Sequence, residues 1–222
     1  MEKLEGATRI KRWLVIVIVT LMTIDLVVVV SKGLWLSAFL IMMIALLILL
    51  VTVFSDRLVV QIPPEFQVLA LLFVFAALFL GEVRSYYDRF WWWDIALHGT
   101  SGLLMGILGF LLIYVLNASR AIAFSMTPRF VAFFAFIFAV AVGGLWEIFE
   151  FAMDSFFGTV MQKPMLGDPS GLTDTMWDMI VNTIGAAIIS TMGWWYMMRE
   201  RRSFIDVWID KFIDRNPDWF VS

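Results

Sequence analysis

The residues of this chain that could do chemistry are carboxylates and one histidine inside long apolar segments. They form three groups: Asp94 with His98; Glu147, Glu150 and Asp154; and Asp174, Asp178 and Asn182. The spacings are i, i+4, then i, i+3, i+7, then i, i+4, i+8, so each group lies along one face of a helix. Ionisable groups in such helices are costly to bury and are therefore paired, hydrated or functional.

These side chains have the ligand types of a divalent-metal site. Six carboxylates and one imidazole cannot all be held as bare charges away from water, so either several are protonated or a cation neutralises them. Oxygen ligands favour Mg²⁺, Mn²⁺ or Ca²⁺, and the histidine also permits Zn²⁺ or Fe²⁺. We expect four residues to act as metal ligands or acid–base groups: His98, Glu147, Glu150 and Asp178. Asn182 would orient a substrate or a ligand.

The three outer acids also have structural explanations. Asp174 follows a loop rich in Pro and Gly and could cap its helix, whereas Asp154 could be a solvated helix end. Asp94 could lie at headgroup level among tryptophans. Any of the three could instead support the inner residues. Asp25, further towards the N-terminus, either joins the set or pairs with a neighbouring helix.

The segments that carry these residues are those of a polytopic membrane protein. The chain is 62% hydrophobic, whereas a soluble domain is about half apolar, and the excess lies in long blocks. About 20 apolar residues of helix cross bilayer hydrocarbon, where the backbone must satisfy its own hydrogen bonds. We predict an all-α bundle with a single six-helix transmembrane domain, residues 1–202, and spans at about 13–30, 34–54, 66–80, 91–116, 130–151 and 174–198.

The basic residues orient this predicted bundle. With the N-terminus in the cytoplasm, twelve Lys and Arg fall on the cytoplasmic side and four, namely Lys32, Arg84, Arg89 and Lys163, on the other. This bias predicts cytoplasmic termini in the inner membrane. The polar groups then meet near the extracytoplasmic face in three layers: Asp94, Asp154 and Asp174; then His98, Glu150 and Asp178; then Glu147, Asn182 and Gly102.

The C-terminal tail, residues 203–222, has the pattern of an amphipathic helix. Apolar residues recur at helical spacing and aspartates line the opposite face: Phe204, Ile205, Trp208, Ile209 and Phe212 against Asp206, Asp210 and Asp214. This pattern predicts a helix on the inner membrane interface or, equally, a helix packed on loops of the same protein.

Composition excludes several functions. The net charge of −3 gives no basis for nucleic-acid binding, and the absence of cysteine excludes disulfides and thiolate chemistry. Glycines in the fourth, fifth and sixth spans, among them Gly102, Gly143 and Gly185, predict close helix packing.

Three sequence elements resemble a known family. Asp94-Ile95-Ala96-Leu97-His98-Gly99, Trp146-Glu147-Ile148-Phe149-Glu150 and the run from Asp174 to Ala186 resemble elements of the YjdF-like bacterial inner-membrane proteins. Their order is more distantly similar to VanZ-like proteins, a family linked with glycopeptide (teicoplanin) resistance. VanZ-like members usually have a Gln and an Arg in the middle element, where this chain has Glu150. The resemblance covers residues 90–187 and implies that the three elements belong together, without implying a reaction.

Three functions fit these residues. The first is a metal-dependent hydrolase or transferase acting on a lipid or lipid-linked envelope substrate, with the loop 155–173 as a lid. The second is a proton- or cation-coupled transporter, although the cytoplasmic halves of the last three spans carry few polar residues. The third is a non-catalytic scaffold or accessory subunit, in which the polar cluster fixes helix packing.

Overall fold

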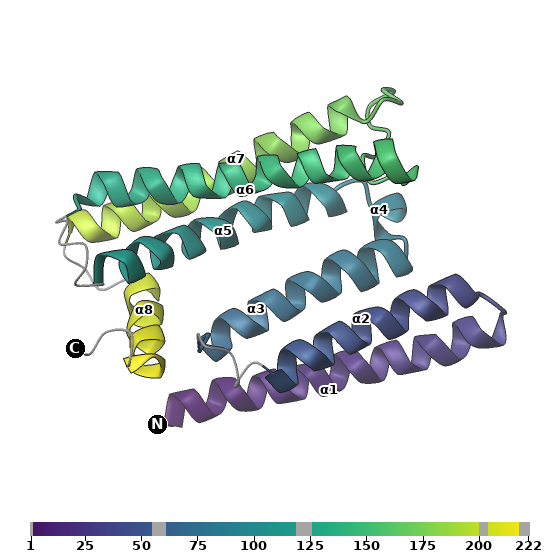
Figure 1. Cartoon of the computed structure of the whole chain (residues 1–222), viewed down its shortest axis with the longest axis horizontal. Helices are drawn as coiled ribbons and strands as arrows, with labels where there is room; N and C mark the ends of the chain where they lie inside the picture. The colour runs from purple at the N-terminus through teal and green to yellow at the C-terminus, as the bar shows by residue number, and fades with distance from the viewer. Residues whose placement is uncertain (1, 55–60, 119–125, 200–203, 218–222) are drawn as a thin grey trace. The chain divides into compact units, whose positions relative to one another are not determined.

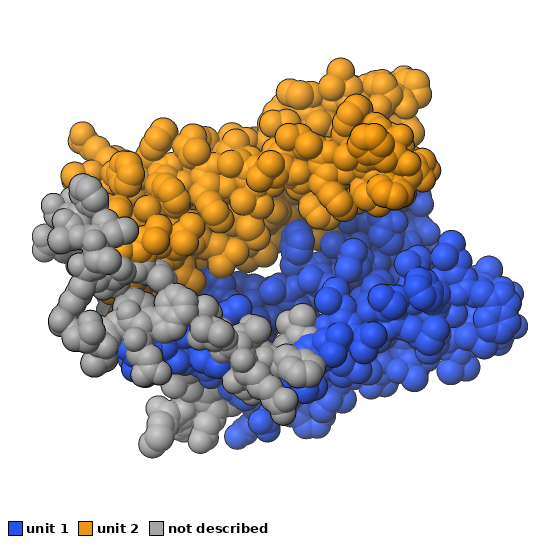
Figure 2. Space-filling view, viewed as in Figure 1, with its two compact units in different colours: residues 1–93, 211–218 blue, residues 94–210, 219–222 orange. Residues whose placement is uncertain are grey.

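The computed structural model describes residues 2–54, 61–118, 126–199 and 204–217. Within these ranges the chain is almost entirely helical and forms no strand, apart from an isolated bridge between Met165 and Asp168. The predicted all-α class is confirmed. The chain divides into two compact units, residues 1–93 with 211–218 and residues 94–210 with 219–222 (Figure 2).

The helices follow the predicted apolar segments closely (Figure 1). They are α1 (Glu2–Ser31), α2 (Trp35–Phe54), α3 (Pro64–Val74), η2 (Phe75–Val83), α4 (Tyr86–Arg89), α5 (Trp93–Ala118), α6 (Pro128–Phe157), α7 (Leu172–Met198) and α8 (Phe204–Arg215). Each predicted span starts and ends within a few residues of a helix or, for 66–80, of α3 and η2 together, except that α1 begins earlier and α6 ends later.

Four stretches of the described helices are long and apolar enough to cross a membrane: Thr8–Ser31, Pro64–Val83, Trp93–Tyr114 and Pro128–Phe157. The apolar part of α2, Trp35–Leu50, is shorter. The 27 residues of α7 would reach about 40 Å by helical rise, but this helix carries the polar stripe that begins at Asp174. The fold is therefore that of a helical membrane protein, and the number of six spans stays a prediction.

The first unit is built on a hairpin of α1 and α2. The turn between them passes through Gly33, whose φ of 73° lies in the left-handed region that glycine adopts at least cost. Ile18 and Met22 of α1 are buried with Ile41 of α2 and with Phe79 of η2. These contacts place the three elements around one apolar core.

The predicted third span changes helix type halfway along. After α3 the backbone continues as a π-helix, η2, whose hydrogen bonds run from residue i to i+5. The Arg84 N–H, just beyond η2, donates to the Phe79 carbonyl at 2.9 Å, and the Arg84 guanidinium donates to Asp25 Oδ1 at 2.8 Å. Asp25 is therefore paired with a neighbouring helix of its own unit, the second of its two predicted roles.

The helix predicted in the tail is present as α8. Its Phe212 is buried, and Lys211 forms an ion pair with Glu65 of α3. Asn216, just after α8, accepts a hydrogen bond from the Gln61 N–H at 2.6 Å and donates one to the Gln61 carbonyl at 2.9 Å. The end of α8 thus packs on a loop of the same chain, which is the second of the two arrangements predicted for the tail. The side chains of residues 204–206 lie outside the described residues.

The second unit holds α5, α6 and α7 side by side (Figure 1). Glycines make the close approach possible: a Cβ at Gly102 would overlap the Asn182 carbonyl, one at Gly143 the Asn182 side chain, and one at Gly185 the Gly99 carbonyl. The packing role predicted for these glycines is confirmed. Asn182 of α7 lies at the point where the three helices meet.

We expect Gly143→Ala to destabilise the protein, whereas Gly144→Ala should not. The added methyl at position 143 falls on the Asn182 side chain, which overpacking values put at about 1–3 kcal/mol of unfolding free energy. At position 144 the nearest atom is 4.0 Å away, so alanine's better helix propensity should add up to about 1 kcal/mol. Thermal unfolding in detergent measures both. Equal midpoints for the two variants would contradict the packing described.

Candidate metal centre

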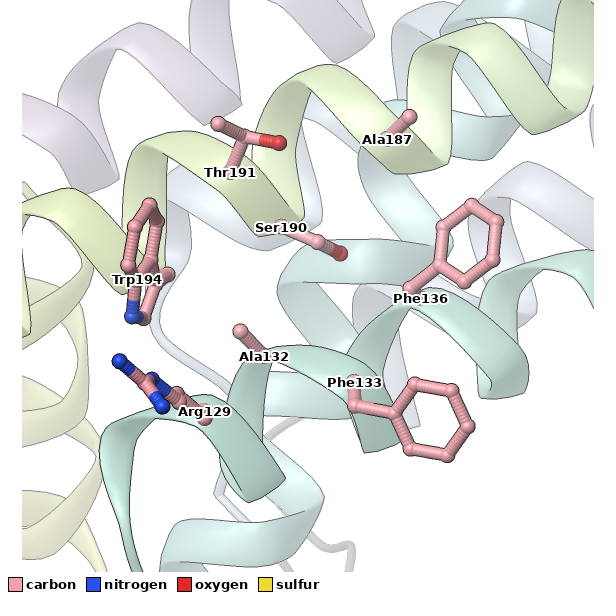
Figure 3. A pocket seen from close by; sticks show the side chains of 8 residues that line it. All are labelled: Arg129, Ala132, Phe133, Phe136, Ala187, Ser190, Thr191 and Trp194. Atoms are coloured by element: carbon pink, nitrogen blue, oxygen red, sulfur yellow. The ribbon is translucent and has the colours of Figure 1, made fainter.

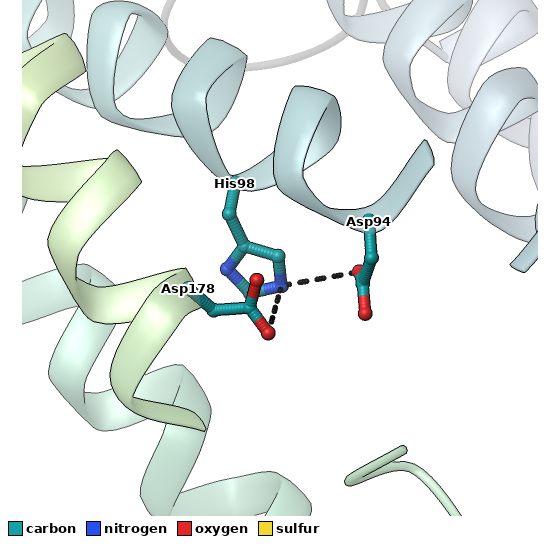
Figure 4. A group of neighbouring side chains, drawn as sticks. All are labelled: Asp94, His98 and Asp178. Atoms are coloured by element: carbon teal, nitrogen blue, oxygen red, sulfur yellow. Dashed lines mark ion pairs between the residues drawn. The ribbon is translucent and has the colours of Figure 1, made fainter. Parts of the chain in front are cut away.

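The polar cluster of the second unit is centred on the imidazole of His98. Asp94 lies one turn earlier on α5, and its Oδ1 is 3.5 Å from His98 Nε2. Asp178 of α7 approaches the same nitrogen, with Oδ2 at 3.9 Å (Figure 4). Two carboxylates from two helices therefore face one ring nitrogen.

A third helix contributes a carboxylate to the other side of the ring. Glu147 Oε1, from α6, is 3.5 Å from His98 Nδ1. The side chains are shielded from the surroundings: Glu147 is 4% exposed, Asp178 1% and His98 11%. The predicted meeting of the three helices at these residues is thus present in the structure.

Two of the buried carboxylates, those of Glu147 and Asp178, have few polar partners. Both oxygens of Glu147 and both of Asp178 are buried and accept no hydrogen bond from the described part of the chain. Buried carboxylates without compensation are strongly unfavourable, so these oxygens need a proton or a cation. The donor set of two aspartates and a histidine, with ligand atoms within 4.8 Å of one another, is of the kind that holds divalent metals.

Asn182 lies one turn deeper on α7 than Asp178 and connects two helices. Its Nδ2 donates to the Ala139 carbonyl of α6 at 3.3 Å, while its Oδ1 is buried and accepts no hydrogen bond within the described ranges. Gly102 of α5 is at the same depth, as the layers predicted. Glu147, predicted one layer below His98, instead reaches it, because its side chain spans the difference of one turn.

Glu150 is buried but has a partner on its own helix. The Trp146 indole N–H donates to Glu150 Oε1 at 2.8 Å, across an i, i+4 spacing. No ion pair of Glu150 with His98 occurs among the described residues, although the spacing puts Glu150 on the same face of α6 as Glu147. Glu150 therefore lies near the carboxylates that face His98 but does not contact the imidazole as they do.

The two remaining outer acids hold the loop between α6 and α7. Asp154 accepts hydrogen bonds from the Thr159 hydroxyl and from the N–H groups of Met161 and Gln162, at 2.6–2.9 Å. Asp174 Oδ2 accepts the N–H of Lys163 at 2.7 Å. Both acids thus have structural roles, although not the ones predicted: the N-cap of α7 is Gly171 and not Asp174, and Asp154 is bonded to the loop and is not merely solvated. Only Asp94 of the three outer acids lies against His98.

The sequence of the whole membrane region has known relatives. Residues 10–199 match the family described as "Predicted membrane protein (DUF2238)". The chain belongs to this family. The DUF2238 match includes the first three predicted spans as well as the region of the YjdF-like resemblance, which is consistent with it.

One relative is an uncharacterized protein of Thermotoga maritima, 26% identical over 125 residues, or 56% of this chain. The aligned part spans 59% of that relative's length, and its description names no activity. No solved structure matches the chain. Membership of DUF2238 therefore establishes a membrane protein and leaves the reaction to be argued from the site.

Sequence reasoning missed the structural role of Asp168 in this DUF2238 chain. It accepts hydrogen bonds from the hydroxyl and N–H of Ser170 at 2.7 and 2.9 Å, and from the N–H and hydroxyl of Thr173 at 3.0 and 2.8 Å. These bonds hold the loop against the first turn of α7. The signal was an Asp with Ser and Thr two and five residues later, just before a helix, a capping pattern.

The Asp168 bonds make the loop sensitive to acid. Chiefly because Ser170 donates to its carboxylate, and Thr173 as well, the pKa of Asp168 lies well below its ordinary value of about 3.9. The lower pKa belongs to the folded state, so the stabilisation is complete above that ordinary value and is lost as the pH falls through the folded value.

We expect the hydrogen-exchange protection factors of residues 158–171, which correct for the intrinsic pH dependence of exchange, to be high at neutral pH and to fall once the pH drops below about 4. Asp168→Ala should show low protection of this loop at every pH, because the four bonds are absent. Asp88→Asn, an exposed residue of α4, serves as the control and should exchange like the wild type. Slow exchange of the loop in Asp168→Ala would show that other contacts hold it.

Proposed function

We propose that this protein is a membrane-embedded, metal-dependent hydrolase or transferase whose substrate is a lipid or a lipid-linked molecule. The observation that carries the proposal is the His98 imidazole set between carboxylates of α5, α6 and α7, with four buried carboxylate oxygens that accept no hydrogen bond within the described chain. On the predicted orientation the site opens to the extracytoplasmic side of the inner membrane.

Asp94, His98 and Asp178 are the proposed metal ligands. Ligand bonds of about 2.0–2.2 Å put neighbouring ligand atoms roughly 3–4 Å apart. The separations of 3.5 and 3.9 Å from His98 Nε2 to the two aspartates fall in that range. Mg²⁺, Mn²⁺, Ca²⁺ and Zn²⁺ are all compatible with two carboxylates and one imidazole.

Glu147 has a different task in this proposal, which is to position His98. A histidine that binds a metal through one nitrogen commonly donates its other N–H to a carboxylate, and this fixes the tautomer and the ring. Glu147 lies 3.5 Å from Nδ1, opposite the two aspartates. The sequence analysis expected Glu147 to be a metal ligand. Its place beside Nδ1 supports a role in positioning His98 better than a role as a ligand.

The remaining residues have roles in proton transfer and access. A bound divalent ion would supply a reactive water or polarise a phosphoryl or acyl oxygen of the substrate. Glu150, oriented by Trp146, is the proposed acid–base group, and Asn182 sets the depth at which the ligands meet. The loop 158–171, tied down by Asp154 and Asp174, would be a fixed rim in place of a mobile lid.

Transport has less support than catalysis. Between Asn182 and Ser190 the buried residues of α7 are Gly185, Ala186 and Ile189, so about two helical turns there carry no ionisable group. A proton or cation path needs polar or hydrated steps across the membrane. A VanZ-like role in glycopeptide resistance is not part of the proposal, since Glu150 takes the place of that family's Gln.

We expect purified wild-type protein to bind about one divalent ion per chain, measured by elemental analysis after incubation with Mg²⁺, Mn²⁺, Ca²⁺ and Zn²⁺. Asp178→Asn removes a ligand and should abolish binding. Glu147→Gln should weaken it by about 10–100-fold. Glu150→Gln is the matched control, because it changes a buried acid of the same cluster that is not a proposed ligand, and it should keep the metal.

Activity separates the enzyme from a scaffold. Wild-type protein with metal should turn over a member of a panel of phospholipids and polyprenyl phosphates. Asp178→Asn and Glu150→Gln should both lose turnover while unfolding at the temperature of the metal-free wild type or above it. Absence of metal in the wild type, or full turnover in Asp178→Asn, would end the proposal. Loss of stability in every variant without any turnover in the wild type would favour the scaffold.

A further inference from the structure

A groove lies at the other end of the same pair of helices. It has a volume of about 310 Å³ and is lined by residues spaced i, i+3, i+4 and i+7 on each helix. From α6 these are Arg129, Ala132, Phe133 and Phe136, and from α7 Ala187, Ser190, Thr191 and Trp194 (Figure 3). Asp178 and Trp194 are separated by about 24 Å along α7 by helical rise, so the groove is distinct from the metal centre.

We propose that this groove binds an anionic phospholipid, whose phosphate is held by Arg129 and Trp194 and whose glycerol ester is held by Ser190. Polar groups at one end of the groove and apolar groups along it match the two parts of such a lipid. The proposal does not depend on the reaction at His98.

The polar groups of the groove point to an anion. Arg129 and the Trp194 indole offer only hydrogen-bond donors, and Figure 3 shows the indole nitrogen facing the guanidinium. Two donors cannot bond each other, so their approach calls for an acceptor that both can reach. The Trp194 N–H has no hydrogen-bond partner among the described residues, and no acidic residue lines the groove. A phosphate oxygen meets this requirement and would form a charge-assisted bond with arginine.

Ser190 supplies a second, independent observation. Its residue is only 5% exposed, its hydroxyl has no hydrogen-bond partner within the described ranges, and the hydroxyl oxygen points into the groove. A buried hydroxyl without a partner is unfavourable, so a ligand that accepts its hydrogen bond would stabilise the site. Ser190 precedes Trp194 by one helical turn, about 6 Å further from the end of α7.

The spacing of these donors distinguishes a phospholipid from free phosphate. A phospholipid carries ester carbonyl oxygens a few ångströms deeper than its phosphate, which is where Ser190 lies relative to Trp194. Below them Phe133 and Phe136 offer aromatic surface to acyl chains, and the small side chains of Ala132 and Ala187 leave room between the helices. Free phosphate would use only the donors of Arg129 and Trp194 and would leave the Ser190 hydroxyl without a partner.

The charge of the surrounding chain is consistent with this choice. The groove is at the end of α6 and α7 that the sequence predicts to be cytoplasmic, where Lys and Arg are concentrated. Basic residues at this depth attract anionic lipids of the inner leaflet. Arg129 lies in the first turn of α6, whose Thr127 cap and Pro128 fix the start of the helix.

The proposal is tested by native mass spectrometry of the full chain in detergent, titrated with phosphatidylglycerol. We expect the affinity to fall by about tenfold or more in Arg129→Gln combined with Trp194→Phe, and by several-fold in Ser190→Ala. Arg199→Gln is the matched control. It removes a cation from the same end of α7 that stacks on Trp195 at 4.3 Å and does not line the groove, so the affinity should stay within about twofold.

Five outcomes would overturn the proposal. The first four are wild-type affinity in the double variant, wild-type affinity in Ser190→Ala, an equal loss in Arg199→Gln, and equally tight binding of zwitterionic phosphatidylcholine. The fifth is displacement of phosphatidylglycerol by inorganic phosphate, which would show that the groove takes a free anion. Ser190→Ala and Trp194→Phe are small changes, and unfolding at the wild-type temperature confirms that the variants fold. The metal content of the double variant should equal that of the wild type, which separates this test from that of the metal centre.

Discussion

The close approach of α5, α6 and α7 at Asn182 is the constraint on which the rest of the second unit depends. Glycines on the neighbouring helices leave room for the Asn182 side chain and backbone, and the hydrogen bond to Ala139 ties α7 to α6. Since the helices are rigid rods, fixing their contact at one level fixes the depth of every residue above it. His98 therefore meets carboxylates from both neighbours one turn away from this contact.

The acidic residues of this unit occupy two different environments. Asp154, Asp168 and Asp174 lie where backbone N–H groups of a loop can reach them, and their negative charge is satisfied by hydrogen bonds. Glu147 and Asp178 lie between helices, whose own N–H groups are already used within the helix. Side chains of the same chemical type thus organise the loop in one place and require a proton or a cation in the other.

The helices and the grouping of the inner residues could be predicted from the sequence, because both depend on short-range periodicity. Apolar blocks set the helix ends, and the i, i+4 spacing of Asp94 and His98 already put them on one face. The pairing of His98 with Glu147 could not be assigned, because it depends on the tilt of α6 and on how far a glutamate side chain reaches. The hydrogen bonds of Asp154 and Asp168 depend on loop backbone geometry, and the partner of Asp25 on a helix type that composition does not reveal.

That helix type, the π-helix η2, has a consequence for how the third span is studied. A π-helix turns each residue through a smaller angle than an α-helix, so the direction of side chains after Phe75 drifts away from a 3.6-residue pattern. A scan of introduced cysteines, for which this cysteine-free chain is a natural background, would report accessibility with a longer repeat along 75–83 than along α3. Helical wheels drawn through both segments would assign Glu82 and its neighbours to the wrong side of the span.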